Sequence, residues 1–175
     1  MSPLSIEVLS AERLRASLGD LAALLEDAVE SGASVGFLLP LEHRDALRFW
    51  DEVVAKISSG DLILLVAWLD GRLAGSVQLA LENRPNGRHR AEVVKLLVHR
   101  SARRRGIGQA LMQAVEEVAL EAGRTLLVLD TRRGDAAQQL YSKIGYVPAG
   151  MIPRYALSSS GSLDDTVFFY KELSR

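Results

Sequence analysis

The feature that most constrains the fold is a basic, glycine-containing loop between a predicted strand and a predicted helix. It reads Arg103-Arg104-Arg105-Gly106-Ile107-Gly108-Gln109. The segment before it, 91–98, carries few polar residues and predicts a strand covered on both faces. The segment after it, about 106–122, has apolar residues at helical spacing and is followed by Gly123, which predicts a helix that ends there. A strand at 126–130 comes next, so this region predicts a strand, a helix and a strand in succession.

The first half of the chain predicts two helices and then a hairpin. Ser10 is a candidate N-cap for a helix whose apolar residues recur at helical spacing, namely Leu14, Leu18, Leu21, Leu25 and Ala28. A loop at 31–40 separates it from a second helix at 43–58, which Gly60 ends. The period then changes to that of strands, and the predicted hairpin comprises 62–69, the turn Asp70-Gly71 and 73–81.

Hairpins early and a strand–helix–strand order late predict an α+β (mixed α/β) fold with one sheet, antiparallel first and part parallel at the end. The other predicted elements are a strand at 6–9, a helix at 135–144, and strands at 146–149 and 166–170. A length of 175 residues with 48% apolar content predicts a single domain over 1–175. The absence of cysteine excludes disulfides and thiol catalysis. Because no apolar run is long enough for a bilayer, we expect a cytoplasmic protein without a membrane partner.

The glycine-containing loop is suited to binding an anion. Glycines at the start of a helix let several backbone N–H groups point at one anion, and the helix dipole favours negative charge there. The neighbouring arginines add charge-assisted contacts to phosphate. The loop therefore suits a pyrophosphate, although it matches neither the three-glycine dinucleotide fingerprint nor the Gly-Lys-Ser/Thr loop. The residues alone leave open an exposed basic loop with a glycine turn.

In this setting R-x-x-G-x-G, followed by AQQLYSKIGY at 137–146, resembles the two coenzyme A-binding motifs of GNAT acetyltransferases. The resemblance implies the GNAT fold, a mixed and mostly antiparallel twisted sheet that is splayed in the middle and flanked by about four helices. It implies acetyl-CoA as cosubstrate and an amine as acceptor. It also implies that the hydroxyl of Tyr141 protonates the departing thiolate; the alternative is a packed aromatic residue. Gly134 departs from the pattern, because many members have asparagine there.

A narrower resemblance is to the tabtoxin-resistance acetyltransferases. The stretches that carry it are Gly32-Ala33-Ser34-Val35-Gly36-Phe37, Arg84-Pro85-Asn86-Gly87 with Arg90-Ala91-Glu92-Val93, and Leu129-Asp130-Thr131. It covers almost the whole chain. This branch acetylates the free α-amine of a β-lactam amino-acid toxin, so the resemblance implies a small amino-acid-like acceptor and a role in toxin resistance.

Glu92 and Asp130 are the candidate bases. Glu92 lies eleven residues before Arg103, a spacing similar to that of the base glutamate in histone-acetylating members. An apolar strand disfavours its charged form, which raises its pKa and makes it a better base near neutrality. In the implied fold the strand that Asp130 ends neighbours 91–98, so two carboxylates enter one cleft and can bind an ammonium group. The alternatives are an ion pair of Glu92 with Arg90, and a strand-end cap for Asp130.

The resemblance also assigns residues to the cofactor and the acceptor. We expect the backbone of Leu96, Leu97 and Val98 to pair with the pantetheine arm as an added strand. We expect the pyrophosphate to bind the loop, that is Arg103, Arg104, Arg105, Gly106, Ile107, Gly108 and Gln109, with Tyr141 near the thioester. Ser34, Phe37 and Trp50 are the expected wall of the acceptor site, with plain packing as the alternative.

Other functions remain open at this stage. A GNAT enzyme could acetylate a phosphinothricin-like amino acid, a polyamine or a protein N-terminus. Residues 84–105 hold eight Lys or Arg against one Glu, as a nucleic-acid-binding face does, but no stacking aromatics are interleaved, so we expect no nucleic acid. A non-catalytic sensor of acetyl-CoA is a third class. The scattered His43, His89 and His99 predict no metal site. Both a monomer and a homodimer are compatible with the sequence.

Overall fold

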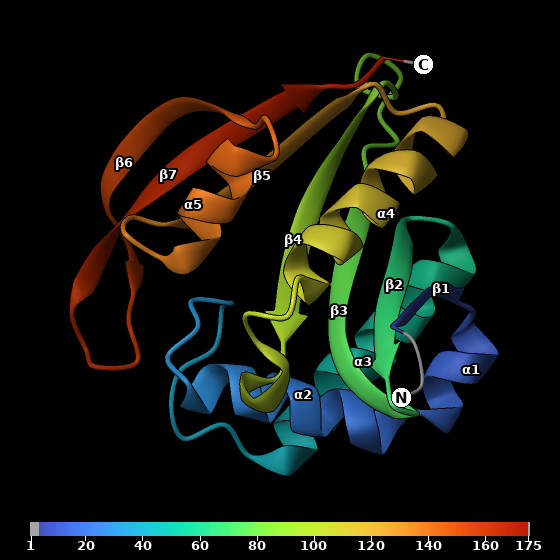
Figure 1. The fold of residues 1–175 in the computed structure, drawn as a ribbon, viewed down its shortest axis with the longest axis vertical. Helices are drawn as coiled ribbons and strands as arrows, with labels where there is room; N and C mark the ends of the chain where they lie inside the picture. Colours follow the sequence, from blue (N-terminus) through green and yellow to red (C-terminus); the bar gives the residue numbers. More distant parts are fainter. Residues whose placement is uncertain (1–3, 175) are drawn as a thin grey trace.

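The computed structural model describes residues 4–174 as a seven-stranded sheet with helices packed on it (Figure 1). The strands are β1 (Ser5–Leu9), β2 (Leu62–Leu69), β3 (Arg72–Leu81), β4 (Arg90–Val98), β5 (Leu126–Arg132), β6 (Val147–Leu157) and β7 (Leu163–Glu172). The helices are α1 (Ala11–Ala16), α2 (Leu18–Glu30), α3 (His43–Ser59), α4 (Ile107–Glu121) and α5 (Ala136–Lys143), with a 3-10 turn η1 (Arg100–Ala102).

The sheet has the order β1-β2-β3-β4-β5-β7-β6 and is antiparallel except between β4 and β5. That parallel pair is short, since β4 contacts β5 only from Arg90 to Glu92. Beyond this point the two strands separate, and Figure 1 shows them together at the top of the view and apart at the bottom. The predicted mixed, splayed sheet is therefore confirmed.

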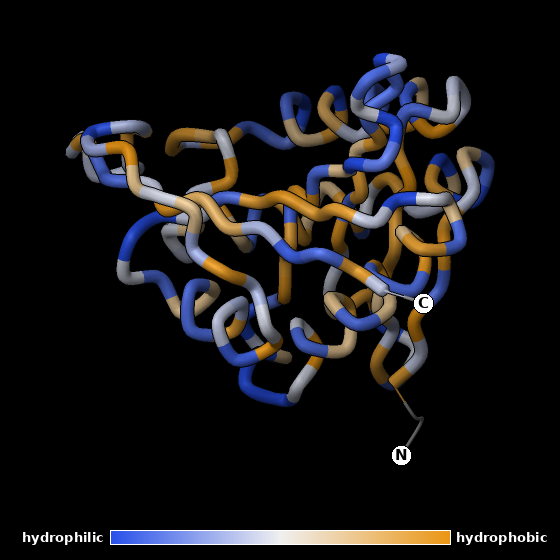
Figure 2. The backbone as a smooth tube through the Cα atoms, turned by 90° about the horizontal axis from the view of Figure 1, so that it is seen from above, coloured by the Kyte–Doolittle hydropathy of each residue, from blue (hydrophilic) through white to orange (hydrophobic). Residues whose placement is uncertain are grey.

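Two apolar clusters cover the two faces of the sheet. One contains the buried face of α4, together with Val77, Leu79, Ala91 and Leu127 from the strands. The other contains α1, α2 and α3, together with Leu64, Val66 and Leu97. Figure 2 shows the hydrophobic residues gathered in the inner strands and the hydrophilic ones in the outer turns. Burial of one leucine side chain stabilises the folded state by about 1.5–3 kcal/mol relative to leaving it exposed. These clusters therefore hold the helices on both faces of the sheet.

Most predicted elements lie within two residues of their observed bounds, but three differ. The first predicted helix is divided at Ser17, which has a non-helical φ of −111° and ψ of 15°, so five α-helices flank the sheet in residues 4–174 rather than about four. The last two strands are longer than predicted, because they form a hairpin that continues to a turn at 158–162. None of the described helices is long and apolar enough to cross a membrane.

Candidate active site

The loop between η1 and α4 presents a row of backbone amides without partners. In residues 4–174 the amides of 103–109 donate no backbone hydrogen bond, and the next amide, that of Ala110, donates to Gly106 O at 3.0 Å. Arg104 and Gly106 have positive φ angles of 59° and 79°. Left-handed residues in such loops turn neighbouring N–H groups into a common concavity. Since α4 also has no side-chain cap, its N-terminus is open to an anion.

A hollow of about 520 Å³ adjoins this loop, between the end of α2, the end of β4 and the start of α5. The predicted cofactor residues that line it are Leu96, Leu97, Val98, Arg103, Arg104, Gly106, Ile107, Gly108 and Gln109. Arg105 is exposed and is not among the lining residues. The other walls are residues that were not predicted as cofactor-binding, namely Ala28, Ser31, Gly32, Ala33, Ala102, Arg132, Asp135, Ala136, Ala137 and Leu140.

β4 has a free edge beside this hollow. Its pairing with β5 ends at Glu92, and from there to Val98 the strand pairs with β3 on its other side. An unpaired strand edge can accept an extended ligand as an added strand. Arg103 Nε donates to Val98 O at 3.1 Å, so this side chain lies back along the end of β4.

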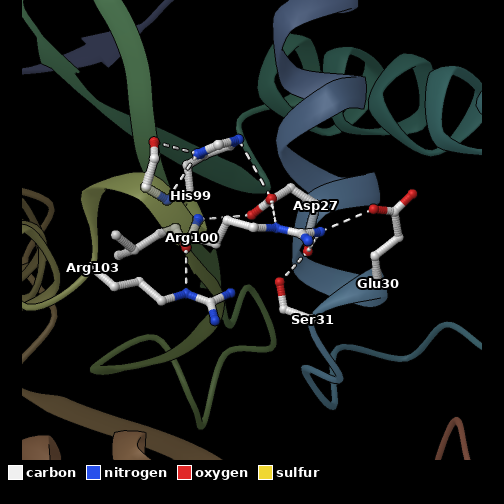
Figure 3. A network of polar contacts seen from close by, with 8 residues as sticks. Asp27, Glu30, Ser31, His99, Arg100 and Arg103 are labelled. Atoms are coloured by element: carbon white, nitrogen blue, oxygen red, sulfur yellow. Dashed lines mark hydrogen bonds and ion pairs between the residues drawn. The ribbon is translucent and has the colours of Figure 1, made fainter.

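A polar network fastens the start of this loop to α2 (Figure 3). Asp27 is only 8% exposed; it accepts hydrogen bonds from the backbone N of Arg100 at 2.9 Å and from Arg100 Nε. His99 Nε2 lies 3.4 Å from the same carboxylate. The other end of the Arg100 guanidinium pairs with Glu30 at 2.9 Å. Asp27 was not predicted from the sequence. The one sequence feature that marks it is its acidic side chain at a buried position of an otherwise apolar helix face.

Strand register places Glu92 and Asp130 on the same face of the sheet. Glu92 pairs with Val128, and side chains alternate along a strand, so Asp130 points to the same face as Val128 and Glu92. The neighbouring Leu127 and Leu129 point the other way, into the α4 cluster. β4 and β5 diverge just after this pairing, so Glu92 lies at the last paired position of β4 and Asp130 lies two residues beyond its partner Val128 on β5.

The pKa of each carboxyl group is raised above its ordinary value. Burial is the largest cause for Glu92, and the charge of Asp130 raises the pKa further, while Lys95 and Arg90 lower it. Burial also raises the pKa of Asp130, against a lowering by Lys95. A carboxylate with a raised pKa is a stronger base once it is ionised. The charge of Asp130 therefore acts on Glu92, and Lys95 acts on both acids.

The structural alternatives for these two acids do not hold. Arg90 Nη2 pairs with Glu82 Oε2 at 3.0 Å instead of with Glu92. In residues 4–174 neither Glu92 nor Asp130 forms a salt bridge or a side-chain hydrogen bond, and β5 continues to Arg132, so Asp130 does not cap the strand. Both side chains reach solvent although surrounding protein atoms desolvate them in part, so both can meet a ligand.

Family comparison decides the enzyme class. Residues 21–146 match the model of the acetyltransferase (GNAT) family. The chain belongs to this family. An uncharacterized N-acetyltransferase of Azospirillum brasilense is 35% identical to it over 123 residues, which cover 69% of this chain and 71% of the relative. As a member of the GNAT family, the chain is an acetyl-CoA-dependent N-acetyltransferase.

Solved structures share this GNAT fold over nearly the whole chain. An N-acetyltransferase from Staphylococcus aureus has a TM-score of 0.81 at 20% identity, covering 99% of this chain and 100% of that one. A Salmonella typhimurium protein solved with its cofactor acetyl-CoA has a TM-score of 0.80 at 18% identity, covering 99% and 96%. At these identities the likeness concerns the fold.

Tyr141 is buried in the apolar cluster that α4 forms with the sheet, together with Leu127 and Leu129. It is 6% exposed, and its ring is 5.8 Å from that of Tyr146 and 6.0 Å from that of Phe169. Burial raises the pKa of its hydroxyl far above the usual value, and Asp130 raises it further, so the hydroxyl keeps its proton at neutral pH. The side chain is not among those that line the large hollow, where its neighbour Leu140 is found.

A second, smaller hollow of about 240 Å³ lies between the loop 32–38 and the tip of the β6–β7 hairpin. Ser34 and Phe37 line it, as the predicted acceptor wall requires. The prediction for Trp50 was wrong: this residue is 0% exposed, and its Nε1 donates to Leu21 O at 2.8 Å. A fully buried indole stabilises the packing of α3 on α2 and cannot contact an acceptor. The two hollows share Gly32, Ala33 and Arg132.

Gly134, which departs from the GNAT pattern, lies in a turn with a left-handed backbone conformation. The residue has a φ of 85°, a left-handed conformation that glycine adopts freely and asparagine tolerates better than most residues. Its amide donates to Gln138 Oε1 at 2.9 Å, at the start of α5. The backbone at this position therefore suits glycine, and glycine supplies no side-chain amide there.

Proposed function

We propose that this GNAT enzyme acetylates the primary amine of a small amino-acid-like molecule, with β-lactam amino-acid toxins of the tabtoxinine type within its range. The observation that carries the proposal is the position of Glu92 and Asp130 on one face of the diverging strands, free of internal partners. Two carboxylates in one opening attract an ammonium group and can take its proton, directly or through water.

The residues around the larger hollow fit acetyl-CoA. The unpartnered amides of 103–109 and the open N-terminus of α4 suit its pyrophosphate, with Arg103 and Arg104 beside them. The free edge of β4 at Leu96 and Leu97 suits an extended pantetheine arm. When bound, acetyl-CoA supplies an acetyl group already activated as a thioester.

The chain's own groups then handle the protons. The acceptor amine must lose its proton before its nitrogen can form a bond to the acetyl carbon, and Glu92 or Asp130 receives that proton. As the carbon–sulfur bond breaks, the sulfur gains negative charge, and the Tyr141 hydroxyl, which stays protonated at neutral pH, can donate its proton to it. The nitrogen, positively charged after it bonds to the acetyl carbon, loses its second proton in the same step, and a proton from solvent restores the tyrosine. Asp27, Arg100 and η1 hold the binding loop in place.

A panel of acceptors tests the proposed substrate class. With purified enzyme and saturating acetyl-CoA, thiol release is measured with the proteinogenic α-amino acids, tabtoxinine-β-lactam, spermidine and a short peptide with a free N-terminus. The proposal predicts turnover of the small amino-acid amines in preference to the other two. Turnover of spermidine or the peptide, with no reaction of any amino acid, contradicts it.

Substitution of the two acids tests the proposed bases. We expect Glu92→Gln and Asp130→Asn each to lower kcat by roughly 10²–10⁴-fold, the usual contribution of a general base. The dissociation constant for acetyl-CoA, measured by calorimetry, should stay within a factor of two or so of the wild-type value, because neither acid lines the cofactor hollow. Glu117→Gln, on the exposed side of α4, is the matched control. An unchanged kcat in either variant removes that residue from the mechanism.

A further inference from the structure

We propose that Lys95 selects the acceptor: its ammonium group binds the carboxylate of an amino-acid substrate, while Glu92 and Asp130 bind the amine. This rests on the proposed acetylation of amino-acid-like amines and names the group that recognises them. Lys95 is in neither coenzyme motif, and nothing in the sequence pattern distinguished it from other strand residues.

The backbone at Lys95 is the first observation. The pairing of β4 with β3 passes from Val94 opposite Gln78 to Leu97 opposite Ser76, so Lys95 and Leu96 together face the single residue Val77. This is a β-bulge, a device that re-aims side chains next to active sites. Lys95 has a φ of 53°, which costs a residue with a side chain roughly 1–2 kcal/mol. Strain of this kind persists where the surrounding structure enforces it, and it is concentrated at functional sites.

The direction of the side chain is the second observation. Lys95 Nζ lies 5.9 Å from the centre of the Phe49 ring on α3, and 3.6 Å from where a Cβ on Gly36 would be. Gly36 lines the smaller hollow together with Ser34 and Phe37. The bulge therefore sends the ammonium group to the α3 side of the sheet, the face that also carries Glu92 and Asp130.

The absence of a direct partner is the third observation. Across residues 4–174 Lys95 forms no salt bridge or hydrogen bond. Burial lowers the pKa of its ammonium group below the ordinary value, and the charges of Asp130 and Glu92 offset only part of this lowering. A partly buried ammonium group without a partner is costly unless an anion binds to it. On the same face of β3, the side-chain nitrogen of Gln78 is buried and has no hydrogen-bond partner within the described residues.

The charges complement a zwitterion. Two carboxylates beside one ammonium group match a molecule that carries an α-ammonium and an α-carboxylate a few ångströms apart. A polyamine would place its second positive charge near Lys95 and Lys56, where it is repelled. An amino-acid amide keeps the amine but removes the negative charge that Lys95 would bind.

Paired acceptors test the proposal directly. The amino acid with the highest kcat/KM in the acceptor panel and its own α-amide are compared at saturating acetyl-CoA. The wild type, Lys95→Met and Lys95→Arg are measured, with Arg15→Met on the exposed side of α1 as control. Loss of one charge-assisted contact corresponds to roughly 10- to 100-fold. We therefore expect the wild type to prefer the acid by at least about tenfold, mainly through KM. Lys95→Met should erase this preference, Lys95→Arg should keep part of it, and the control should keep all of it.

Three other results would contradict either the role of Lys95 or the proposed substrate class. Equal loss of kcat/KM for acid and amide in Lys95→Met shows that Lys95 does not bind the carboxylate. Thermal unfolding and acetyl-CoA binding show whether Lys95→Met folds. If it does not fold, the wild type alone decides: equal kcat/KM for the amino acid and its amide refutes the inference. Failure of every amino acid and amide as acceptor, with spermidine acetylated, refutes the proposed substrate class instead.

Discussion

At the scale of single residues, the binding loop depends on a conformation that few side chains tolerate. Gly106 has a φ of 79° at the N-cap of α4, and a Cβ added there would meet no atom within 4 Å. A substitution therefore acts through backbone strain alone, without a clash. The left-handed conformation costs an alanine roughly 1–2 kcal/mol, which the loop can relieve by moving its amides.

Gly106→Ala should therefore weaken acetyl-CoA binding roughly tenfold, because the amides no longer converge on the pyrophosphate. Gly60→Ala is the matched control: Gly60 ends α3 with a φ of 78° and equally open surroundings, away from the loop. Denaturant unfolding should show similar losses of stability in both variants, and calorimetry should show weaker binding in Gly106→Ala alone. Equal affinities in the two variants would argue against the loop as the pyrophosphate site.

At the scale of elements, α2 supports the binding loop through one buried acid. Asp27 receives both the backbone N–H and the side chain of Arg100 directly after β4, so the loop enters α4 from a fixed point. Asp27→Asn removes the charge but keeps the shape. We expect it to lower the free energy of unfolding by about 1–3 kcal/mol and to raise the dissociation constant for acetyl-CoA.

Glu30→Gln is the control for Asp27→Asn, because Glu30 is an exposed partner of the same arginine. Surface pairs of this kind contribute about 0–1 kcal/mol. Urea unfolding and calorimetric titration with acetyl-CoA measure both quantities. If Glu30→Gln has as large an effect as Asp27→Asn, or if neither has one, the anchoring role of Asp27 is wrong.

Some boundaries of the helices and strands could be predicted from local sequence signals, and others could not. Ser10 caps α1 through a hydrogen bond from Arg13 N, and Gly60 ends α3 in the left-handed conformation, both as the sequence indicates. The break at Ser17 was missed because the leucine spacing continues across it. β6 was predicted too short because it is an exposed edge strand with Pro148, Gly150 and Pro153 in it, so neither burial alternation nor composition marks its length.

At the scale of the whole molecule, the active site exists only because two halves of the sheet meet. The motifs predicted residues that line the larger hollow at the start of α4, because a loop before a helix is a local feature. Lys95 could not be predicted, since a bulge depends on how two strands pair. Trp50 was predicted in the acceptor wall, but it lies four residues before Val54, the spacing of one helix face, and both are buried in the structure.

If Glu92 and Asp130 are the bases, as proposed, they also determine the pH dependence of catalysis. A carboxylate accepts a proton only when ionised, so activity is present above the pKa of the acids and lost as pH falls through it. Because burial raises the pKa of Glu92 and Asp130, the acid limb of kcat should lie above the ordinary carboxylate range of about 4. The two acids interact, so the limb in the wild type belongs to the pair.

The shift of this limb in Asp130→Asn is the most direct test of the central claim that the two carboxylates work in one cleft. We would measure kcat against pH at saturating concentrations of both substrates, which reports the groups of the bound complex. Asp130 raises the pKa of Glu92, so its neutralisation should move the limb of the residual activity to lower pH, while Glu117→Gln leaves the limb unchanged. A limb at the same pH in Asp130→Asn and the wild type would show that the two acids do not share a site.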